Sequence, residues 1–344
     1  MTTVAIASLD ESLETAYDEY LHTSDGGLLY YSLAYRRFLC DLLNCRAEYL
    51  VATSGSRVVG LLPLMALDGP YGTVWNSLPF FGSYGGILAD DAQTAGQLAR
   101  RYDDLTREAG VAAATVVTNP FVPPEANRFP ADTVDERIGQ FTSLEPFRDG
   151  SPDRYLREIE SSARRNVRRA RDAGVVVRID NGALPWLEVA HRDSMVAVGG
   201  RAKPPRFFTL LESHFIAGKD YNVYVADVDG VTAGTLLVFY FNGTVEYFIP
   251  ATLPRYRALQ PMALVIVTAM QDAAAAGHHR WNWGGTWRQQ STLYRFKRKW
   301  NAVDRPYRYY TRINRRELLR CRPDELRAAY GEFYVVPFHL LTTS

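Results

Sequence analysis

Two lysines stand apart in a chain that carries most of its positive charge on arginine. The sequence has four lysines and 35 arginines, and Lys297 and Lys299 lie two residues apart in the segment LYRFKRKWNA. A lysine ammonium is a compact point charge, whereas an arginine guanidinium is a planar fork that pairs with two oxygens at once. A point charge suits a single oxygen that carries negative charge. Lys297 is therefore a candidate functional residue, and the alternative is one more solvated base on a basic strand.

The formal net charge of +1 conceals two halves of opposite sign. Residues 1–150 contain 10 arginines, no lysine and 20 acidic residues, whereas residues 151–344 contain 29 basic and 18 acidic residues. Between residues 280 and 316, 11 bases accompany a single acid, Asp304. Such a field attracts polyanions, and arginine suits phosphate in particular. The other interpretation is that the basic half docks on the acidic half.

Composition places the chain among globular proteins. Apolar residues make up 47% and charged residues 22%, and 344 residues suggest two domains. Apolar runs fall short of the roughly 18 to 20 residues that span a bilayer, and the start MTTVAIASLDESLETAYDEY lacks the basic region of a secretory signal. We expect a cytoplasmic protein without a membrane span. No His or Cys cluster has ligand spacing, so we expect no metal site.

An internal repeat organises the elements that must position these residues. YLVATSGSRVVGLLPL near residue 50 resembles YVADVDGVTAGTLLVF 174 residues later, with Ala52 and Gly60 matching Ala226 and Gly234. Each copy predicts a β-hairpin, followed by a helix that stops at a glycine and then a strand. We therefore expect an α/β protein built by duplication. The predicted domains are 1–150 and 151–315, with 316–344 packing back on the first.

The elements in this order resemble the GNAT acyltransferase superfamily, and the tandem pair with SSARRNVRRARDAGV, PMAL, WNWGGT and LYRFKRKWNA resembles the Fem family. The resemblance covers most of the chain and is strongest at 161–174 and 261–301. It implies two tandem GNAT-like domains without a long helical arm. It also implies a peptidyltransferase that moves an amino acid from aminoacyl-tRNA to an amine of a peptide or peptidoglycan-type acceptor. Asn301 stands where the family commonly has glycine.

The resemblance also assigns roles to residues. Lys297 aligns with the lysine placed near the reacting carbonyl or the tRNA phosphate, where a fixed cation stabilises the tetrahedral oxyanion. The expected substrate-binding residues are Arg36, Arg37, Tyr84, Arg201, Lys203, Arg206, Tyr247, Tyr256, Arg295 and Phe296, although Phe296 also suits the core. The expected tRNA-binding residues are Arg288, Arg298, Lys299 and Arg305.

The choice of acyl donor depends on a glycine-rich loop that this sequence lacks. GNAT acetyltransferases hold the coenzyme A pyrophosphate on a glycine-rich loop at a helix start, whereas the corresponding stretch here, residues 257–263, has no glycine and has Pro261. We expect no cofactor, aminoacyl-tRNA as co-substrate, a peptide or nucleotide-linked acceptor, no DNA partner and a monomer. Two alternatives stay open: an acyl-CoA-dependent N-acyltransferase acting on a sugar or polymer precursor, and a catalytically silent polyanion-binding protein.

Overall fold

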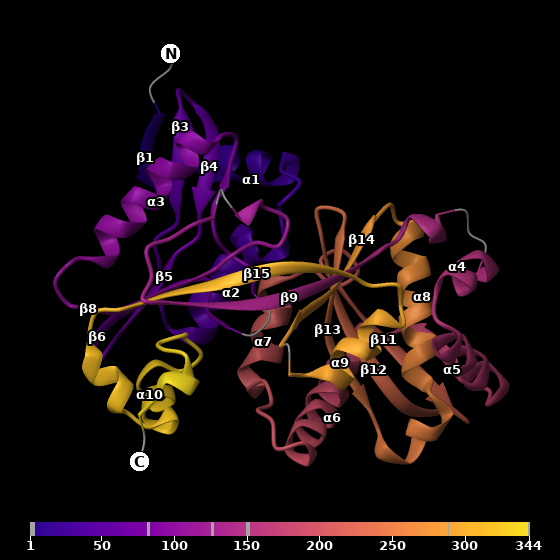
Figure 1. Cartoon of the computed structure of the whole chain (residues 1–344). Coiled ribbons are helices and arrows are strands. Elements are labelled where there is room, and N and C mark those ends of the chain that lie inside the picture. Colours follow the sequence, from indigo (N-terminus) through magenta and orange to yellow (C-terminus); the bar gives the residue numbers. More distant parts are fainter. Residues whose placement is uncertain (1–3, 81–82, 125–126, 149–151, 288, 343–344) are drawn as a thin grey trace. The chain divides into compact units, whose positions relative to one another are not determined.

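The computed structural model describes residues 4–80, 83–124, 127–148, 152–287 and 289–342. It divides into unit 1, Met1–Arg137 with Pro306–Ser344, and unit 2, Ile138–Arg305 (Figure 1). The sequence placed these boundaries at 150/151 and 315/316. They differ because strand β9, Thr133–Ser143, runs through the first boundary and strand β15, Val303–Ile313, runs through the second. The division therefore falls inside regular strands.

Unit 1 contains two ladders of strands. The first has the order β1-β3-β4-β7 and is antiparallel throughout. In the second, β2, β5 and β6 pair antiparallel, β6 pairs parallel with β8, and β8 pairs antiparallel with β15. The strands are β1 Val4–Ser8, β2 Arg46–Ala47, β3 Leu50–Ser54, β4 Arg57–Leu62, β5 Met65–Gly69, β6 Gly72–Ser77, β7 Leu88–Ala89 and β8 Val111–Val117.

In the described part of unit 1, four α-helices accompany these strands: α1 Glu14–Thr23, α2 Leu33–Leu43, α3 Ala92–Thr106 and α10 Pro323–Tyr330. Helix α3 packs on β3 and β4, and α1 packs on β4. The C-terminal segment belongs to this unit. The Tyr330 hydroxyl donates to the Gly72 carbonyl (2.9 Å) and accepts from the Tyr71 amide (3.1 Å), which ties α10 to the β5–β6 turn.

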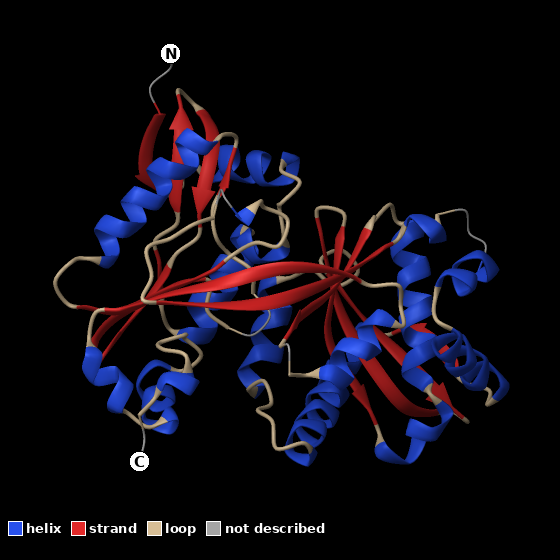
Figure 2. Ribbon diagram, in the orientation of Figure 1, coloured by secondary structure: helices blue, strands red, loops and turns tan. Residues whose placement is uncertain are grey.

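Unit 2 is built on one sheet that is flanked by helices (Figure 2). Among the described residues its strands have the order β10-β11-β12-β13-β14-β9, and β13 and β14 are its one parallel pair. The further strands are β10 Val176–Ile179, β11 Tyr221–Val228, β12 Val231–Phe241, β13 Thr244–Thr252 and β14 Arg280–Thr286. The helices are α4 Pro152–Glu158, α5 Ser161–Asp172, α6 Leu184–Ala197, α7 Pro205–His214, α8 Pro261–Ala275 and α9 Ser291–Arg298. No helix among the described residues is long and apolar enough to cross a membrane.

Helices cover both faces of this sheet. Successive residues of a strand point to opposite faces, so one strand can pack on helices at both of them. Val238 of β12 belongs to the core cluster that contains α5 and α8. Phe239, the next residue, packs its ring on Phe215 and Phe248, and Phe248 stacks on Phe207 of α7. The sheet is therefore the middle layer of an α/β sandwich.

The two units repeat the same hairpin, as the sequence predicted. Ala52 lies opposite Gly60 in β3 and β4, and Ala226 lies opposite Gly234 in β11 and β12. In each hairpin the register shifts directly after the alanine. Each copy continues into a 15-residue helix, α3 or α8, then a glycine with positive φ and a strand. Duplication of one hairpin-helix-strand unit thus describes both halves.

Strands β13 and β14 pair only at their starts. Thr244–Glu246 lie opposite Arg280–Asn282, after which β13 stays paired with β12 and β14 pairs with β9 through Gly285 and Thr286. The two strands therefore diverge towards their carboxyl ends. Helix α9 begins at Ser291, after β14 has ended at Thr286, and its Lys297 contacts Gly284 and Gly285 at this diverging end.

Candidate active site

Lys297 is buried, with 3% of its surface exposed, and it lies on helix α9. The sequence predicted a strand here, and that prediction was wrong: Phe296, Lys297 and Trp300 have the spacing of one inward helical face. The Lys297 ammonium donates to the carbonyls of Gly284 and Gly285 (3.0 Å each) and to the Thr286 hydroxyl (2.8 Å). The alternative of a solvated base is therefore excluded.

The turn that receives this ammonium depends on glycine. Gly284 has φ +74°, a left-handed conformation that costs other residues about 1 kcal/mol or more. The ladder between β14 and β9 shifts register between Asn282 and Gly285, so the strand is irregular at the turn whose two carbonyls accept from the ammonium. The WNWGGT motif thus forms an oxygen-lined socket for one cation.

Burial lowers the pKa of Lys297 to about 7. The three oxygens favour the charged ammonium, whereas removal from water favours the neutral amine. A lysine with this pKa changes its charge near neutral pH, so it can serve as a cation below that value and as an amine base above it. Groups tuned in this way are common at reaction centres.

A chain of hydrogen bonds continues from the socket on the Thr286 side. Thr286 accepts from Lys297 and donates to the side-chain oxygen of Gln140 (3.0 Å), and both residues are fully buried. The Gln140 amide donates to Asp304 (3.4 Å), which also accepts from the Tyr294 hydroxyl (2.7 Å). These contacts fix the orientation of the Thr286 hydroxyl.

On the other side the chain ends at a buried carboxylate that the sequence analysis missed. The Gly284 amide donates to the Asn282 side-chain oxygen (2.8 Å), and the Asn282 amide donates to Glu246 (2.6 Å). Glu246 is 2% exposed and lies opposite Asn282 at the last paired position of β13 and β14. The signal was an acid inside the apolar strand TVEYFIP. The buried polar groups therefore meet where the two strands part.

Aromatic rings pack beside this network. Tyr247 of β13 lies 5.0 Å from the Trp283 ring, measured between centroids, and Phe296 lies 6.0 Å from the same ring. Both are half-buried and pack on the core of unit 2. Burial raises the pKa of the Tyr247 phenol, which keeps it protonated. The structure thus brings Lys297, Phe296 and Tyr247 into one neighbourhood.

The remaining predicted residues of unit 2 lie on or near its surface. Lys203 is held over the rings of Phe248 (4.9 Å) and Phe207 (5.2 Å), and Tyr256 lies under the Arg255 guanidinium (5.0 Å). The exposed ones are Arg201, Arg206, Arg295, Arg298 and Arg305, and Lys299 is half-buried at the end of α9. Arg288 lies outside the described residues.

Three predicted residues belong to unit 1. Arg36 and Arg37 of α2 pair with Glu14 (3.6 and 2.6 Å). Tyr84 is 1% exposed, and its ring packs edge-on against Tyr30 and Tyr307. Tyr84 is thus part of the core of unit 1. Among the described residues, no three His, Cys, Asp or Glu side chains lie together in a way that could hold a metal ion.

The start of helix α8 bears on the choice of acyl donor. Pro261 at the first position has no amide proton, and the Ala263 amide donates to the Gln260 carbonyl (3.0 Å). Gln260 itself is in the left-handed region at φ +58°. A pyrophosphate needs several amides that point outwards from a helix start. This first turn offers few of them.

Residues 157–298, all within unit 2, match the family model described as an acetyltransferase (GNAT) domain. Among solved structures, the chain is similar to FemX, with 12% identity, a TM-score of 0.71, and coverage of 91% of this chain and 98% of FemX. It is also similar to the C-terminal domain of a putative lysylphosphatidylglycerol synthetase from Agrobacterium fabrum, at 13% identity and TM-score 0.56, covering 95% of this chain and 98% of that one.

A third similar structure is a tandem GNAT protein from the clavulanic acid biosynthesis pathway, at 12% identity and TM-score 0.50, covering 90% of this chain and 98% of that one. No curated protein sequence matches this chain significantly. Likeness at such low identity establishes the fold. The predicted α/β architecture of two tandem GNAT-like domains, shared with FemX, is confirmed.

Proposed function

We propose that this chain is an acyltransferase that moves an amino acid from aminoacyl-tRNA to an amine of a peptide or peptidoglycan-type acceptor. The acceptor nitrogen attacks the ester carbonyl, the ribose oxygen of the tRNA leaves with a proton, and an amide forms. The ester is already activated, so the reaction draws on no further energy source.

The observation that carries the choice of donor is the first turn of α8. Pro261 and the internally bonded Ala263 amide leave it poorly suited to a coenzyme A pyrophosphate. Exposed Arg255 and Arg257 precede this turn, and exposed Arg295 and Arg298 lie on α9. Arginine side chains bind phosphate directly and need no backbone amides for it. The backbone of a tRNA acceptor end carries such phosphates. The fold shared with FemX supports the same choice.

In this proposal Lys297 is the catalytic cation. All three of its donors are occupied by Gly284, Gly285 and Thr286, so a direct contact with the oxyanion requires one glycine carbonyl to be released. The charge stabilises the oxyanion in a water-excluded site, where one such donor contributes roughly 3 to 4 kcal/mol. Glu246 is linked to the glycine turn through the Asn282 side chain. We assign Glu246 the role of positioning Asn282 and that turn.

The test is a transfer assay with charged total tRNA, radiolabelled amino acids and an added peptide acceptor. Label should leave the tRNA for the peptide, RNase treatment of the donor should abolish transfer, and acetyl-CoA should not restore it. If the chain binds tRNA but transfers no label, it is a polyanion-binding protein, because the basic surface alone accounts for binding.

A second candidate is an acyl-CoA-dependent N-acyltransferase, favoured by the match of residues 157–298 to an acetyltransferase domain. It requires coenzyme A to bind near Gln260. Thermal stability that rises with micromolar coenzyme A and is indifferent to tRNA would select this candidate over the first.

A further inference from the structure

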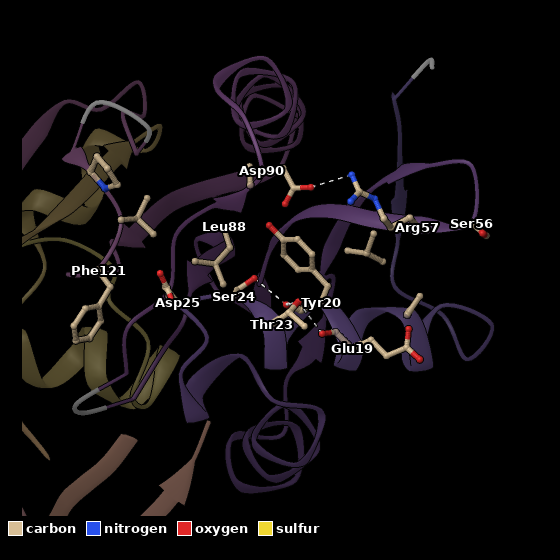
Figure 3. A pocket seen from close by; sticks show the side chains of 16 residues that line it. Glu19, Tyr20, Thr23, Ser24, Asp25, Ser56, Arg57, Leu88, Asp90 and Phe121 are labelled. Carbon is tan, nitrogen blue, oxygen red and sulfur yellow. Dashed lines mark hydrogen bonds and ion pairs between the residues drawn. The ribbon is translucent and has the colours of Figure 1, made fainter. Parts of the chain in front are cut away.

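Unit 1 has a pocket of about 750 Å³ beside helix α1, and several of its polar groups pair within the chain (Figure 3). Asp90 pairs with Arg57 (3.2 Å), and the hydroxyls of Thr23 and Ser24 donate to backbone carbonyls of α1. These contacts indicate no particular ligand. The groups of unit 1 that can react are instead found at the end of helix α2, where two cysteines meet.

Cys40 and Cys45 lie on either side of the turn that ends α2. The helix ends at Leu43, and Asn44 turns the chain in the left-handed region at φ +50°. The amides of Asn44 and Cys45 both donate to the Cys40 carbonyl, the latter at 3.3 Å. In helix endings of this kind, the side chain of the residue that offers the carbonyl often contacts the side chain just beyond the turn. The backbone therefore brings the two thiols together.

The side chains confirm this placement. The Cys45 thiol turns back towards the helix, with its sulfur 3.8 Å from the Leu39 carbonyl and 3.9 Å from the sulfur of Met65. A hydrogen bond between the two thiols is the main cause that lowers the pKa of Cys40 and raises the pKa of Cys45. The Arg36 guanidinium, one turn earlier on α2, also favours the Cys40 thiolate. Cys40 is therefore the thiol that ionises first.

Reagents from solution can reach this pair. Cys40 and Cys45 are half-buried, whereas Cys321, the third cysteine of the chain, is buried. Cys321 follows the short helix Arg316–Arg320, and its thiol donates to the Glu317 carbonyl (3.7 Å). Thiols react when they are accessible and easily ionised, and those next to a second thiol can close to a disulfide. Cys321 thus serves as an internal control for the pair.

We propose that Cys40 and Cys45 form a redox-active dithiol, a modification site at which small disulfides oxidise this chain to an internal disulfide. The thiol that attacks first is Cys40, and Cys45 resolves the intermediate. The proposal concerns unit 1 alone and does not depend on the reaction proposed for Lys297.

The oxidation proceeds by two exchanges with glutathione disulfide. The Cys40 thiolate attacks one sulfur of glutathione disulfide, so that a mixed disulfide forms and one glutathione thiolate leaves. Cys45 then loses its proton and attacks the Cys40 sulfur, and the second glutathione thiolate leaves. Two protein thiols are oxidised, one glutathione disulfide is reduced, and the two released protons are taken up by the glutathione thiolates. The backbone hydrogen bond between Cys45 and Cys40 holds the ends of this ring together before it closes.

The test incubates the full chain with glutathione disulfide, blocks the remaining thiols with N-ethylmaleimide in denaturant and maps the peptides by mass spectrometry without reductant. A disulfide between Cys40 and Cys45 should form, Cys321 should carry the maleimide, and dithiothreitol should reverse the change. The proposal is overturned if Cys40 and Cys45 both stay reduced, or if each ends as a separate mixed disulfide with glutathione.

Three serine variants establish the order of attack. Cys45→Ser should accumulate a mixed disulfide with glutathione on Cys40, because the resolving thiol is gone. Cys40→Ser should react with glutathione disulfide about tenfold more slowly than Cys45→Ser does. Cys321→Ser is the matched control and should form the internal disulfide at the rate of the wild type. Equal capture of glutathione by the first two variants would mean that they are independent surface thiols. Thermal melting verifies that each variant folds, and the wild-type peptide map tests the pairing without any variant.

Discussion

The two units share the hairpin-helix-strand arrangement. They differ in the side chain held at the end of the strand that follows the long helix. In unit 2 the strand after the long helix, β14, ends in a glycine turn that holds the buried Lys297 ammonium. In unit 1 the corresponding strand, β8, is followed by Asn119, whose amide donates to the Gly26 carbonyl (2.8 Å). Unit 2 keeps a cation there and unit 1 a neutral side chain.

This difference separates what the fold requires from what function requires. The alanine-glycine pair and the register shift are present in both hairpins, because the third strand passes too close for a side chain at Gly60 and Gly234. The side chains held after β8 and β14 are free to diverge, since the shared hairpin does not fix them.

The largest expected effect is on Lys297. Lys297→Met should lower the transfer rate by roughly two orders of magnitude and leave tRNA affinity nearly unchanged, because the contact with the oxyanion forms mainly in the transition state. Single-turnover rates and filter binding measure the two quantities. Thermal melting should accompany them, because the two glycine carbonyls lose their donor.

Lys299→Met is the control for this variant. On a helix it lies about 200° around the axis from Lys297, rather than on the same face as a strand would place it. It should affect binding alone. If Lys297→Met instead weakens tRNA binding, flattens its salt dependence by about one unit and preserves the saturated rate, then Lys297 is a phosphate anchor.

The shared hairpin makes a prediction for stability. A Cβ at Gly60 would lie 2.9 Å from Thr94 and 3.1 Å from the Leu88 carbonyl, and a Cβ at Gly234 would lie 2.9 Å from the Ala251 carbonyl. Gly60→Ala and Gly234→Ala should each destabilise the chain by about 1 to 3 kcal/mol in urea unfolding. Unequal costs would mean that the two hairpins are not under the same constraint.

Gly96→Ala in helix α3 is the matched control. The nearest atom to its added Cβ is the end of the Arg100 side chain at 3.8 Å, so space is available. Alanine in a helix interior should stabilise by about 0.5 to 1 kcal/mol. Opposite signs for Gly96 and Gly60 would establish that packing, and not loss of glycine as such, sets the cost.

The sequence predicted the repeated elements because their signals are local. Ala52, Gly60 and the polar turn between them specify a hairpin without reference to the rest of the chain, and the glycine after each helix specifies its end. The helix around Lys297 was predicted as a strand, although Phe296 and Trp300 carry a helical spacing. The link from Glu246 through Asn282 to Gly284 had no local signal, because it depends on the register of two strands that are far apart in sequence.

The pH dependence of transfer tests whether the unit 2 cation must be charged. With a pKa of about 7, Lys297 is an ammonium below that pH and an amine above it. If the cation stabilises the oxyanion, its contribution to the rate should fall up to tenfold per pH unit above about 7. Deprotonation of the acceptor amine acts in the opposite direction, so the quantity to follow is the ratio of wild type to Lys297→Arg, which keeps its charge. A ratio that rises with pH would identify Lys297 as a base.

The smallest expected effect is at Thr286, one of the three groups that accept from the Lys297 ammonium. Thr286→Val removes a hydroxyl that accepts from Lys297 and donates to Gln140, while it preserves the shape of the side chain. The ammonium keeps both glycine carbonyls, so we expect a loss of about 1 kcal/mol, or roughly fivefold in rate. The amine should also be favoured further, which would shift the falling limb of the pH profile to lower pH. Thr115→Val in unit 1 is the control, because it removes a buried hydroxyl that pairs with Thr311 (3.1 Å) away from any cation. It should reduce stability by a similar amount and leave the pH profile where it is. If both variants shift the profile equally, Thr286 acts through general loosening of the chain and not through Lys297.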